Sequence, residues 1–227
     1  MFRSARIGVA VTADDGAPLS GRRAQAAKND GAILRAARDV FTADADAPIA
    51  AVARRARVGI SALYRRYPSK EDLLQRLALD GLERYVKEIE AALAEKATPW
   101  QAFVGFMERA LDAGTGSITA RFGADFPATD DMHRLGRHAA DLTARFIQKV
   151  KRAGDLRQDI VVADISLIFE QLQSIKVTSS VSTRQLRRRY LALVLEGLHH
   201  RGGSSLPGPA PRWEEISGRY RAPGKRT

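Results

Sequence analysis

Two short helical segments separated by only three residues constrain the fold of this chain most tightly. Periodic apolar residues predict a helix over residues 22–41, which a run of small polar residues ends. Pro48 opens the next segment, ending at Arg55 or Ala56, because the first turn of a helix does not need its missing N–H. After the tight break at 57–59, a second short helix over 60–67 ends at Pro68. Three helices in so short a stretch describe a helix-turn-helix.

The remainder of the chain continues in helices. Ser69 and Asp72 form a capping box, and leucines at helical spacing extend the helix that follows to about residue 96. The acidic pair at 130–131 provides the expected cap of a later helix. Further helices are predicted over residues 98–113, 130–153, 162–178 and 183–199. No segment alternates like a strand, so we predict an all-α fold: an N-terminal three-helix helix-turn-helix domain and a C-terminal helical domain.

Four segments follow from these patterns. Residues 1–21 lack periodicity and are expected to form a disordered arm. Residues 22–69 are expected to form the helix-turn-helix domain, and residues 70–200 the helical domain. Residues 201–227, rich in glycine, serine and proline, are expected to form a disordered basic tail.

Positive charge is concentrated at both ends of the chain. The formal net charge is +11, and residues 21–70 hold 11 basic against 4 acidic side chains. Residues 71–183 hold 14 basic against 17 acidic side chains, and residues 184–227 hold 10 against 3. This segregation favours a polyanionic partner, although an arginine-rich composition alone also gives a basic chain. The arginine run at 187–189 is expected to be solvated.

The composition excludes several classes of protein. With no cysteine, the chain cannot form disulfides, thiolate zinc sites or iron–sulfur clusters, which fits a reducing cytoplasm. No run approaches the roughly 20 apolar residues of a membrane helix, so we expect an intracellular protein without membrane contact. There is no phosphate-binding glycine loop or nucleophile elbow, and the four histidines are not spaced to share a metal. We therefore expect no enzyme, cofactor or metal site.

The predicted helix at 60–67 has two distinct faces. Leu63 and Tyr67 are four residues apart and are expected to be buried together. Small residues at the start of the opposite face permit close approach to base edges, and arginines further along can bind guanine or phosphate. That face carries Ser61, Ala62, Arg65 and Arg66, with Tyr64 on its flank. By itself, a solvated arginine pair on any surface helix explains this pattern as well.

Three tracts carry a likeness to a known family: AILRAARDVF at 32–41, APIAAVARRA at 47–56 and VGISALYRRYPSKEDLL at 58–74. The pattern Leu-Tyr-x-x-aromatic-Pro-Ser-Lys-Glu directly behind a short helix is the most specific. With these tracts, residues 22–74 resemble the DNA-binding domain of TetR-type transcriptional regulators. The resemblance covers roughly a quarter of the chain.

The resemblance implies that the helix at 60–67 enters the major groove of double-stranded DNA. Base edges would be contacted by Ile60, Ser61, Ala62 and Arg65, and phosphates by Tyr64, Arg66, Lys70, Arg57, Arg22 and Arg23. The helical spacing disagrees only for Ile60, which falls on the stripe of Leu63 and Tyr67. Arg57 stands where the family usually has glycine, which implies either a remodelled turn or an extra phosphate contact. Residues 48–50 lack the usual threonine, so backbone N–H groups would replace it.

The resemblance also implies a homodimer in which the last two long helices pack against their copies. The interface would contain Ile168, Leu172, Ile175, Leu191 and Leu195. The helix at 183–199 has more apolar positions than one stripe needs, which favours an additional apolar surface, although a helix buried within one subunit is the alternative.

A small-molecule effector is the third implication of the resemblance. Its pocket would be lined by Trp100, Phe103, Phe106, Met107, Phe122, Phe126 and Phe146, although for any single one of these side chains core packing is the favoured role. The sequence thus predicts a cytoplasmic, ligand-responsive repressor that binds a pseudo-palindromic DNA operator as a homodimer. The alternative is a helical ligand-binding or scaffold protein without specific operator binding.

Overall fold

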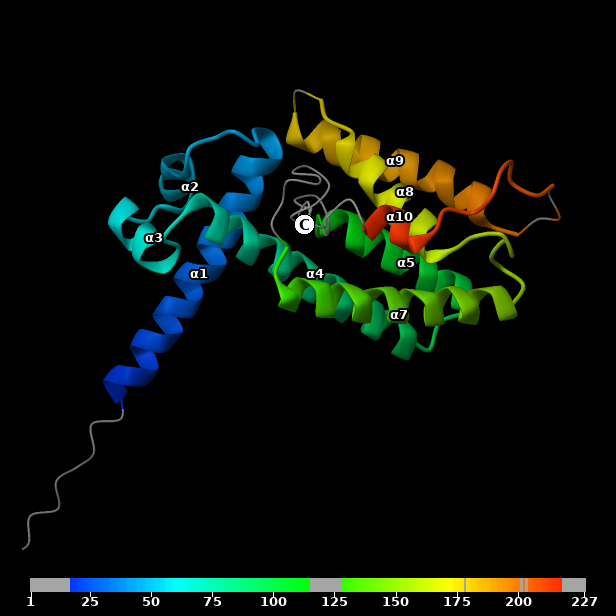
Figure 1. The fold of residues 1–227 in the computed structure, drawn as a ribbon, viewed down its shortest axis with the longest axis horizontal. Helices are drawn as coiled ribbons and strands as arrows, with labels where there is room; N and C mark the ends of the chain where they lie inside the picture. The colour runs from blue at the N-terminus through cyan, green and yellow to red at the C-terminus, as the bar shows by residue number, and fades with distance from the viewer. Residues whose placement is uncertain (1–16, 115–127, 178, 201, 203, 218–227) are drawn as a thin grey trace, which may run out of the picture.

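The computed structural model describes residues 17–114, 128–177, 179–200, 202 and 204–217 (Figure 1). In these residues the only β-structure is a single bridge between Leu156 and His199, so the all-α prediction is confirmed. No helix among them is long and apolar enough to cross a membrane. The helices are α1 (Ala17–Ala43), α2 (Ile49–Ala56), α3 (Ile60–Arg66), α4 (Lys70–Ala94), α5 (Pro99–Asp112), α7 (Asp130–Arg152), α8 (Val162–Ser174), α9 (Ser180–Leu198) and α10 (Trp213–Ser217).

Local side-chain caps explain where several helices begin. At α4 the Ser69 hydroxyl accepts a hydrogen bond from the Asp72 N–H at 3.0 Å, and the Asp72 carboxylate accepts one from the Ser69 N–H at 3.0 Å. At α7 the cap is Thr129, whose hydroxyl accepts from the Met132 N–H, and not the acidic pair at 130–131 that we expected. Those two carboxylates lie in the first turn instead, where they complement the helix dipole.

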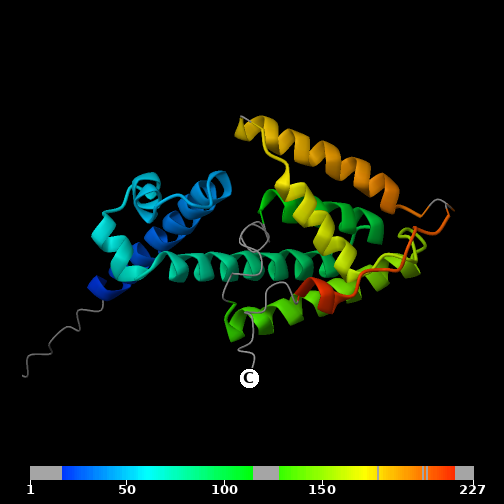
Figure 2. The same cartoon turned by 45° about the horizontal axis from the view of Figure 1, so that its top comes forward.

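Two hydrophobic cores are joined by α4, which runs along the molecule from one to the other (Figure 2). The N-terminal core is formed by α1, α2 and α3 together with Leu73, Leu77 and the first part of α4. The C-terminal core is formed by α5, α7, α8 and α9 around Val86 and Ile89 of the same helix. Helix α4 therefore connects the helix-turn-helix region to the rest of the chain.

Both ends of the chain differ from the sequence prediction. Helix α1 begins at Ala17, so residues 17–21 of the predicted disordered arm are helical, and residues 1–16 lie outside the described residues. The predicted disordered tail is also corrected, because residues 204–217 are anchored to the body. Arg157 donates to the Ser204 carbonyl at 2.7 Å, Asp159 accepts from the Leu206 N–H at 2.9 Å, and Ile216 of α10 is buried beside α8. Composition does not reveal such tertiary contacts.

The arginine run at 187–189 is not simply solvated, contrary to our expectation. The Arg187 guanidinium donates to the carbonyls of Gln173 at 2.6 Å and of Ile175 at 3.1 Å, which caps the end of α8. Burial lowers the pKa of Arg187. Arg188 forms an ion pair with Asp112 of α5, and only Arg189 of the run is exposed without a partner among the described residues. Helix α8 ends at Ser174, and not at residue 178, because the backbone of Ile175 is extended, with φ −62° and ψ 118°.

Candidate nucleic-acid interface

Helix α3 presents one side to solvent and buries the other. Leu63 is fully buried and Tyr67, which follows the helix, is buried as well, as the spacing predicted. Ile60 is 41 % exposed, so it is not buried with Leu63 and Tyr67 as the helical spacing indicated, and Val58 packs against the core instead. The exposed side of α3 consists of Ile60, Ser61, Ala62, Tyr64, Arg65 and Arg66.

The turn between α2 and α3 has a regular geometry despite its unusual residue. Arg57 adopts a left-handed backbone conformation, with φ 58° and ψ 41°. Its N–H donates to the Arg54 carbonyl at 3.3 Å, and the Val58 N–H donates to the Ala53 carbonyl at 3.0 Å, which is the Schellman pattern. An arginine in this conformation destabilises the turn by roughly 1–2 kcal/mol relative to glycine, which has no Cβ to clash. The turn is therefore not remodelled, and the Arg57 side chain is exposed.

On α2, on α3 and in the turn between them, three exposed arginines have no side-chain partner among the described residues: Arg54 on α2, Arg57 in the turn and Arg65 on α3. Two other cations of the domain have protein partners. Arg55 pairs with Asp39 at 2.8 Å, and the Lys70 ammonium donates to the Ala45 carbonyl at 2.9 Å. The three unpaired arginines belong to α2, the turn that follows it and α3, which are consecutive in the chain, so the helix-turn-helix carries positive charge without a protein partner.

Sequence reasoning missed Arg54, although a signal was present. Ile49, Val52 and Ala53 of α2 are buried, and helical spacing places Arg54 on the side of the helix opposite to them. Of the other predicted contacts, Arg22 and Arg23 belong to α1, and their side chains lie outside the described residues.

Arg66 is held by α1. Its guanidinium forms two hydrogen bonds with Asp30, from Nε at 3.0 Å and from a terminal nitrogen at 3.3 Å. The Tyr67 hydroxyl donates to the same carboxylate at 2.5 Å. Burial by itself raises the pKa of Asp30, but the hydrogen bonds from Arg66 and Tyr67 and the charge of Arg66 lower it below its ordinary value. Asp30 is therefore ionised at neutral pH and binds the end of α3.

The residues predicted to line a ligand pocket lie mostly in the C-terminal core. Phe103, Phe106, Met107 and Phe146 are buried, with ring centroids of Phe106 and Phe146 5.8 Å apart. The partly buried Trp100 contacts Phe103 and His199. Phe122 and Phe126 lie outside the described residues. The ring contacts within the described part show core packing, which was the alternative weighed for each of these side chains.

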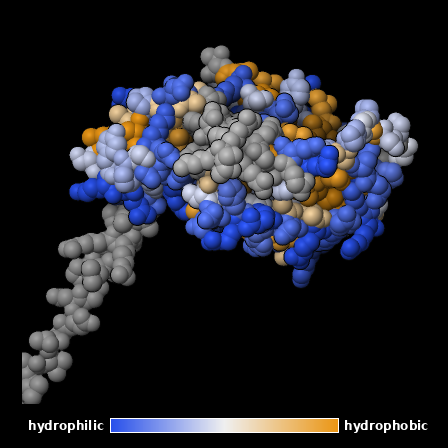
Figure 3. All heavy atoms as spheres, in the orientation of Figure 1, coloured by the Kyte–Doolittle hydropathy of each residue, from blue (hydrophilic) through white to orange (hydrophobic). Residues whose placement is uncertain are grey.

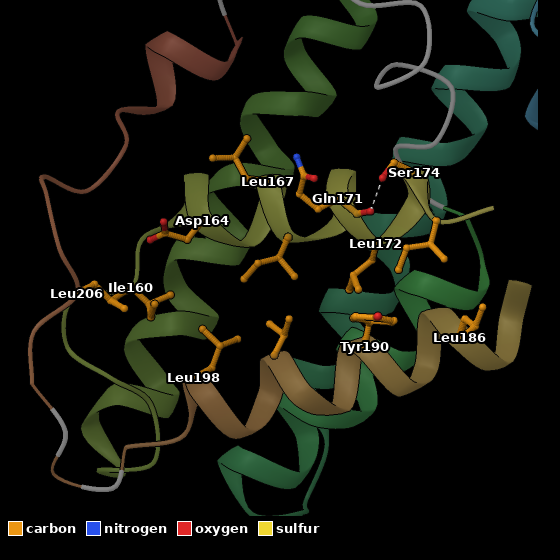
Figure 4. Close-up of a pocket in the computed structure, with 13 residues that line it drawn as sticks. Ile160, Asp164, Leu167, Gln171, Leu172, Ser174, Leu186, Tyr190, Leu198 and Leu206 are labelled. Carbon is orange, nitrogen blue, oxygen red and sulfur yellow. Dashed lines mark hydrogen bonds between the residues drawn. The ribbon is translucent and has the colours of Figure 1, made fainter. Parts of the chain in front are cut away.

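The residues predicted for the dimer interface separate into two groups. Leu172, Leu191 and Leu195 are buried in the core of their own protomer, which leaves them little surface for a partner. Ile168 and Ile175 are partly buried and line a groove of about 750 Å³ between α8 and α9 (Figure 4). The other residues that line it are Ile160, Asp164, Leu167, Gln171, Leu172, Ser174, Leu186, Tyr190, Val194, Leu198 and Leu206.

Helix α9 also carries apolar side chains that its own protomer leaves exposed. Leu193 is 60 % exposed and Tyr190 is 50 % exposed, and Val181 at the start of the helix is 61 % exposed. Apolar residues gather along the edge formed by α8 and α9, whereas the flank formed by α7 is mainly polar (Figure 3). The additional apolar surface that the sequence indicated on this helix is therefore present, on Tyr190 and Leu193 together with Val181.

Two family profiles match the chain in sequence. A profile described as bacterial regulatory proteins of the tetR family matches residues 33–77, and one described as the C-terminal domain of SbtR-like transcriptional regulators matches residues 98–200. A search of curated proteins found no match.

Solved structures share the fold. A TetR transcriptional regulator from Streptomyces coelicolor is 24 % identical, with a TM-score of 0.55 over 76 % of this chain and 99 % of that one. The TetR-like regulator LfrR from Mycobacterium smegmatis, solved in complex with proflavine, is 20 % identical, with a TM-score of 0.56 over 79 % and 99 %. A TetR regulatory protein from Mycobacterium vanbaalenii is 24 % identical, with a TM-score of 0.54 over 78 % and 99 %.

The profiles and the fold agree with the helix-turn-helix geometry described above. Together the two profiles match more than half of the chain, in the order of its two cores. The chain belongs to the TetR family of bacterial regulatory proteins, which are DNA-binding regulators of transcription and not enzymes.

Proposed function

We propose that this protein is a ligand-responsive repressor that binds a pseudo-palindromic operator as a homodimer in the cytoplasm. The observation that carries the proposal is the exposed face of α3, where small side chains at Ser61 and Ala62 precede the unpaired Arg65. A helix with small side chains in its first turn can approach base edges closely. An arginine without a protein partner can bind guanine through two hydrogen bonds.

The contacts that we propose divide into two classes. Ile60, Ser61, Ala62 and Arg65 contact base edges, and these contacts determine the preferred sequence. Arg54, Arg57 and Tyr64 contact phosphates, and they contribute affinity on any duplex. We also propose phosphate contacts for Arg22, Arg23, Arg66 and Lys70. Arg66 would contact DNA while it is bound to Asp30, and Lys70 while it is bound to the Ala45 carbonyl.

The proposed dimer uses the edge formed by α8 and α9. Leu193 and Tyr190 are large apolar side chains left half exposed or more, and the groove between the two helices continues the same surface. Exposed apolar patches of this kind are rare on monomers. A twofold dimer would place two copies of α3 about one turn of DNA apart, which matches a pseudo-palindrome.

Coupling to an effector is proposed to pass through α4, which belongs to both cores. Asp80 of α4 binds Arg38 of α1 at 2.7 Å and Arg84 of its own helix at 2.8 Å, so a shift of α4 is transmitted to the helix-turn-helix domain. A small molecule is the proposed effector, in line with the proflavine complex of LfrR. Such a ligand changes DNA binding only through its different affinities for the two conformations.

Selection of bound duplexes from a random library tests the proposal. Purified protein is used near physiological salt with excess competitor duplex. Enrichment of a pseudo-palindrome is the expected result. Binding without enrichment would mean that the basic surface acts non-specifically, and absence of binding both with and without candidate ligands would favour a helical protein without operator function.

A further inference from the structure

Helix α3 depends on contacts with other elements for its orientation. It has seven residues, too few to be stable alone, and Leu63 is its only buried residue. One buried leucine fixes the distance of a short helix from the core but allows it to rotate and tilt. A contact at the end of α3 therefore has a large influence on where its exposed side chains lie.

Asp30 provides such a contact from α1, 36 residues away in the sequence. Its carboxylate is only 18 % exposed, and it accepts two hydrogen bonds from the Arg66 guanidinium and one from the Tyr67 hydroxyl. A guanidinium bound through two nitrogens has a defined orientation, unlike a single hydrogen bond. Because Arg66 and Tyr67 are consecutive residues at the helix end, their shared partner restrains the rotation and the tilt of α3 together.

We propose that Asp30 is a positioning residue for DNA reading, which acts through Arg66 and Tyr67 to hold α3 in the orientation that selects the operator. The inference rests on the proposed function, since it concerns selectivity between duplexes. Two nitrogens of the Arg66 guanidinium bind Asp30 within the protein, and the Arg66 side chain is still 63 % exposed to solvent.

Neutralising Asp30 changes the affinity for the operator in opposite directions, depending on whether this residue positions α3 or acts only through its charge. Asp30 is a negative charge next to a surface proposed to bind a polyanion, so its charge alone opposes binding to every duplex. Neutralising an acid that has no positioning role raises affinity for all duplexes alike. Neutralising a positioning residue lowers affinity for the operator while affinity for random duplex is unchanged or higher.

The experiment compares Asp30→Asn with Asp39→Asn in the full chain. Asp39 is a matched control because it is also an α1 carboxylate paired with an arginine, Arg55 of α2. Affinities are measured for the duplex enriched in the selection and for a random duplex of equal length. We expect Asp30→Asn to lower the ratio of the two affinities at least tenfold, and Asp39→Asn to leave it unchanged. Thermal unfolding confirms that each variant is folded.

Further variants separate the remaining outcomes. If Asp30→Asn fails to fold, Tyr67→Phe removes one of the three hydrogen bonds while keeping the buried ring, and the ratio is expected to fall in the same direction. A folded Asp30→Asn protein with the wild-type ratio overturns the proposal while the proposed function stands. Wild-type protein that shows no preference for any duplex refutes both. Arg66→Ala removes a proposed phosphate contact together with the partner of Asp30, so we expect it to weaken binding to both duplexes and also to lower the ratio; an unchanged ratio refutes the positioning role of Asp30.

Discussion

Replacing Leu193 by serine tests the proposed dimer most directly. Leu193 is 60 % exposed on α9, so the protomer itself gains little from its apolar surface. Full burial of a leucine side chain stabilises by about 1.5–3 kcal/mol, and the exposed three-fifths therefore correspond to about 1–2 kcal/mol per copy when a partner covers them. A twofold interface uses each residue twice, which gives about 2–4 kcal/mol per dimer.

The expected change is a rise in the dimer dissociation constant of roughly 30- to 700-fold. Sedimentation velocity over a range of protein concentrations measures it, and chemical denaturation of the monomer checks that its stability is nearly unchanged. Ile60→Ser is the matched control, since Ile60 is 41 % exposed on α3, away from the α8–α9 edge. It should leave dimerisation unaltered. A Leu193→Ser protein that dimerises within threefold of wild type would show that this face of α9 is not the interface.

Three further predictions concern single side chains. Arg65→Ala should cost roughly 1–3 kcal/mol and relax preference at one base position, measured by repeating the selection, whereas equal weakening on all duplexes would make Arg65 a phosphate contact. Arg54→Ala should weaken binding to operator and random duplex alike and reduce the slope of log affinity against log salt by about one, and an unchanged slope would remove Arg54 from the interface. Burial raises the pKa of Tyr85 to about 12, and its hydroxyl lies 2.9 Å from that of Thr143. The unfolded chain releases this proton near pH 10, so stability should fall by about 1.4 kcal/mol per unit between about pH 10 and 12, and the difference from Tyr85→Phe in alkaline denaturation should show it.

The sequence by itself determined which segments are helical and that α2 and α3 form a helix-turn-helix. Pro68 and Ser69 act on backbone groups within a few residues of themselves, so they specify where α3 ends and α4 begins. Helical spacing, which is also local, places Leu63 and Tyr67 on the same side of the helix. Because these interactions are local, the helix-turn-helix and its family resemblance were readable without a structure.

Only the tertiary structure decided which of several apolar stripes faces the core. Helix α9 carries apolar residues around most of its circumference, and the positions of α5 and α8 determine that Leu191 and Leu195 are buried while Leu193 is exposed. The same holds for the partners of charged residues: Asp30 with Arg66 and Arg187 with the end of α8 are joined across many residues. Helical periodicity shows which residues share one face of a helix. Packing against distant elements determines whether that face is buried and which residues it contacts, because the contact energy depends on both partners.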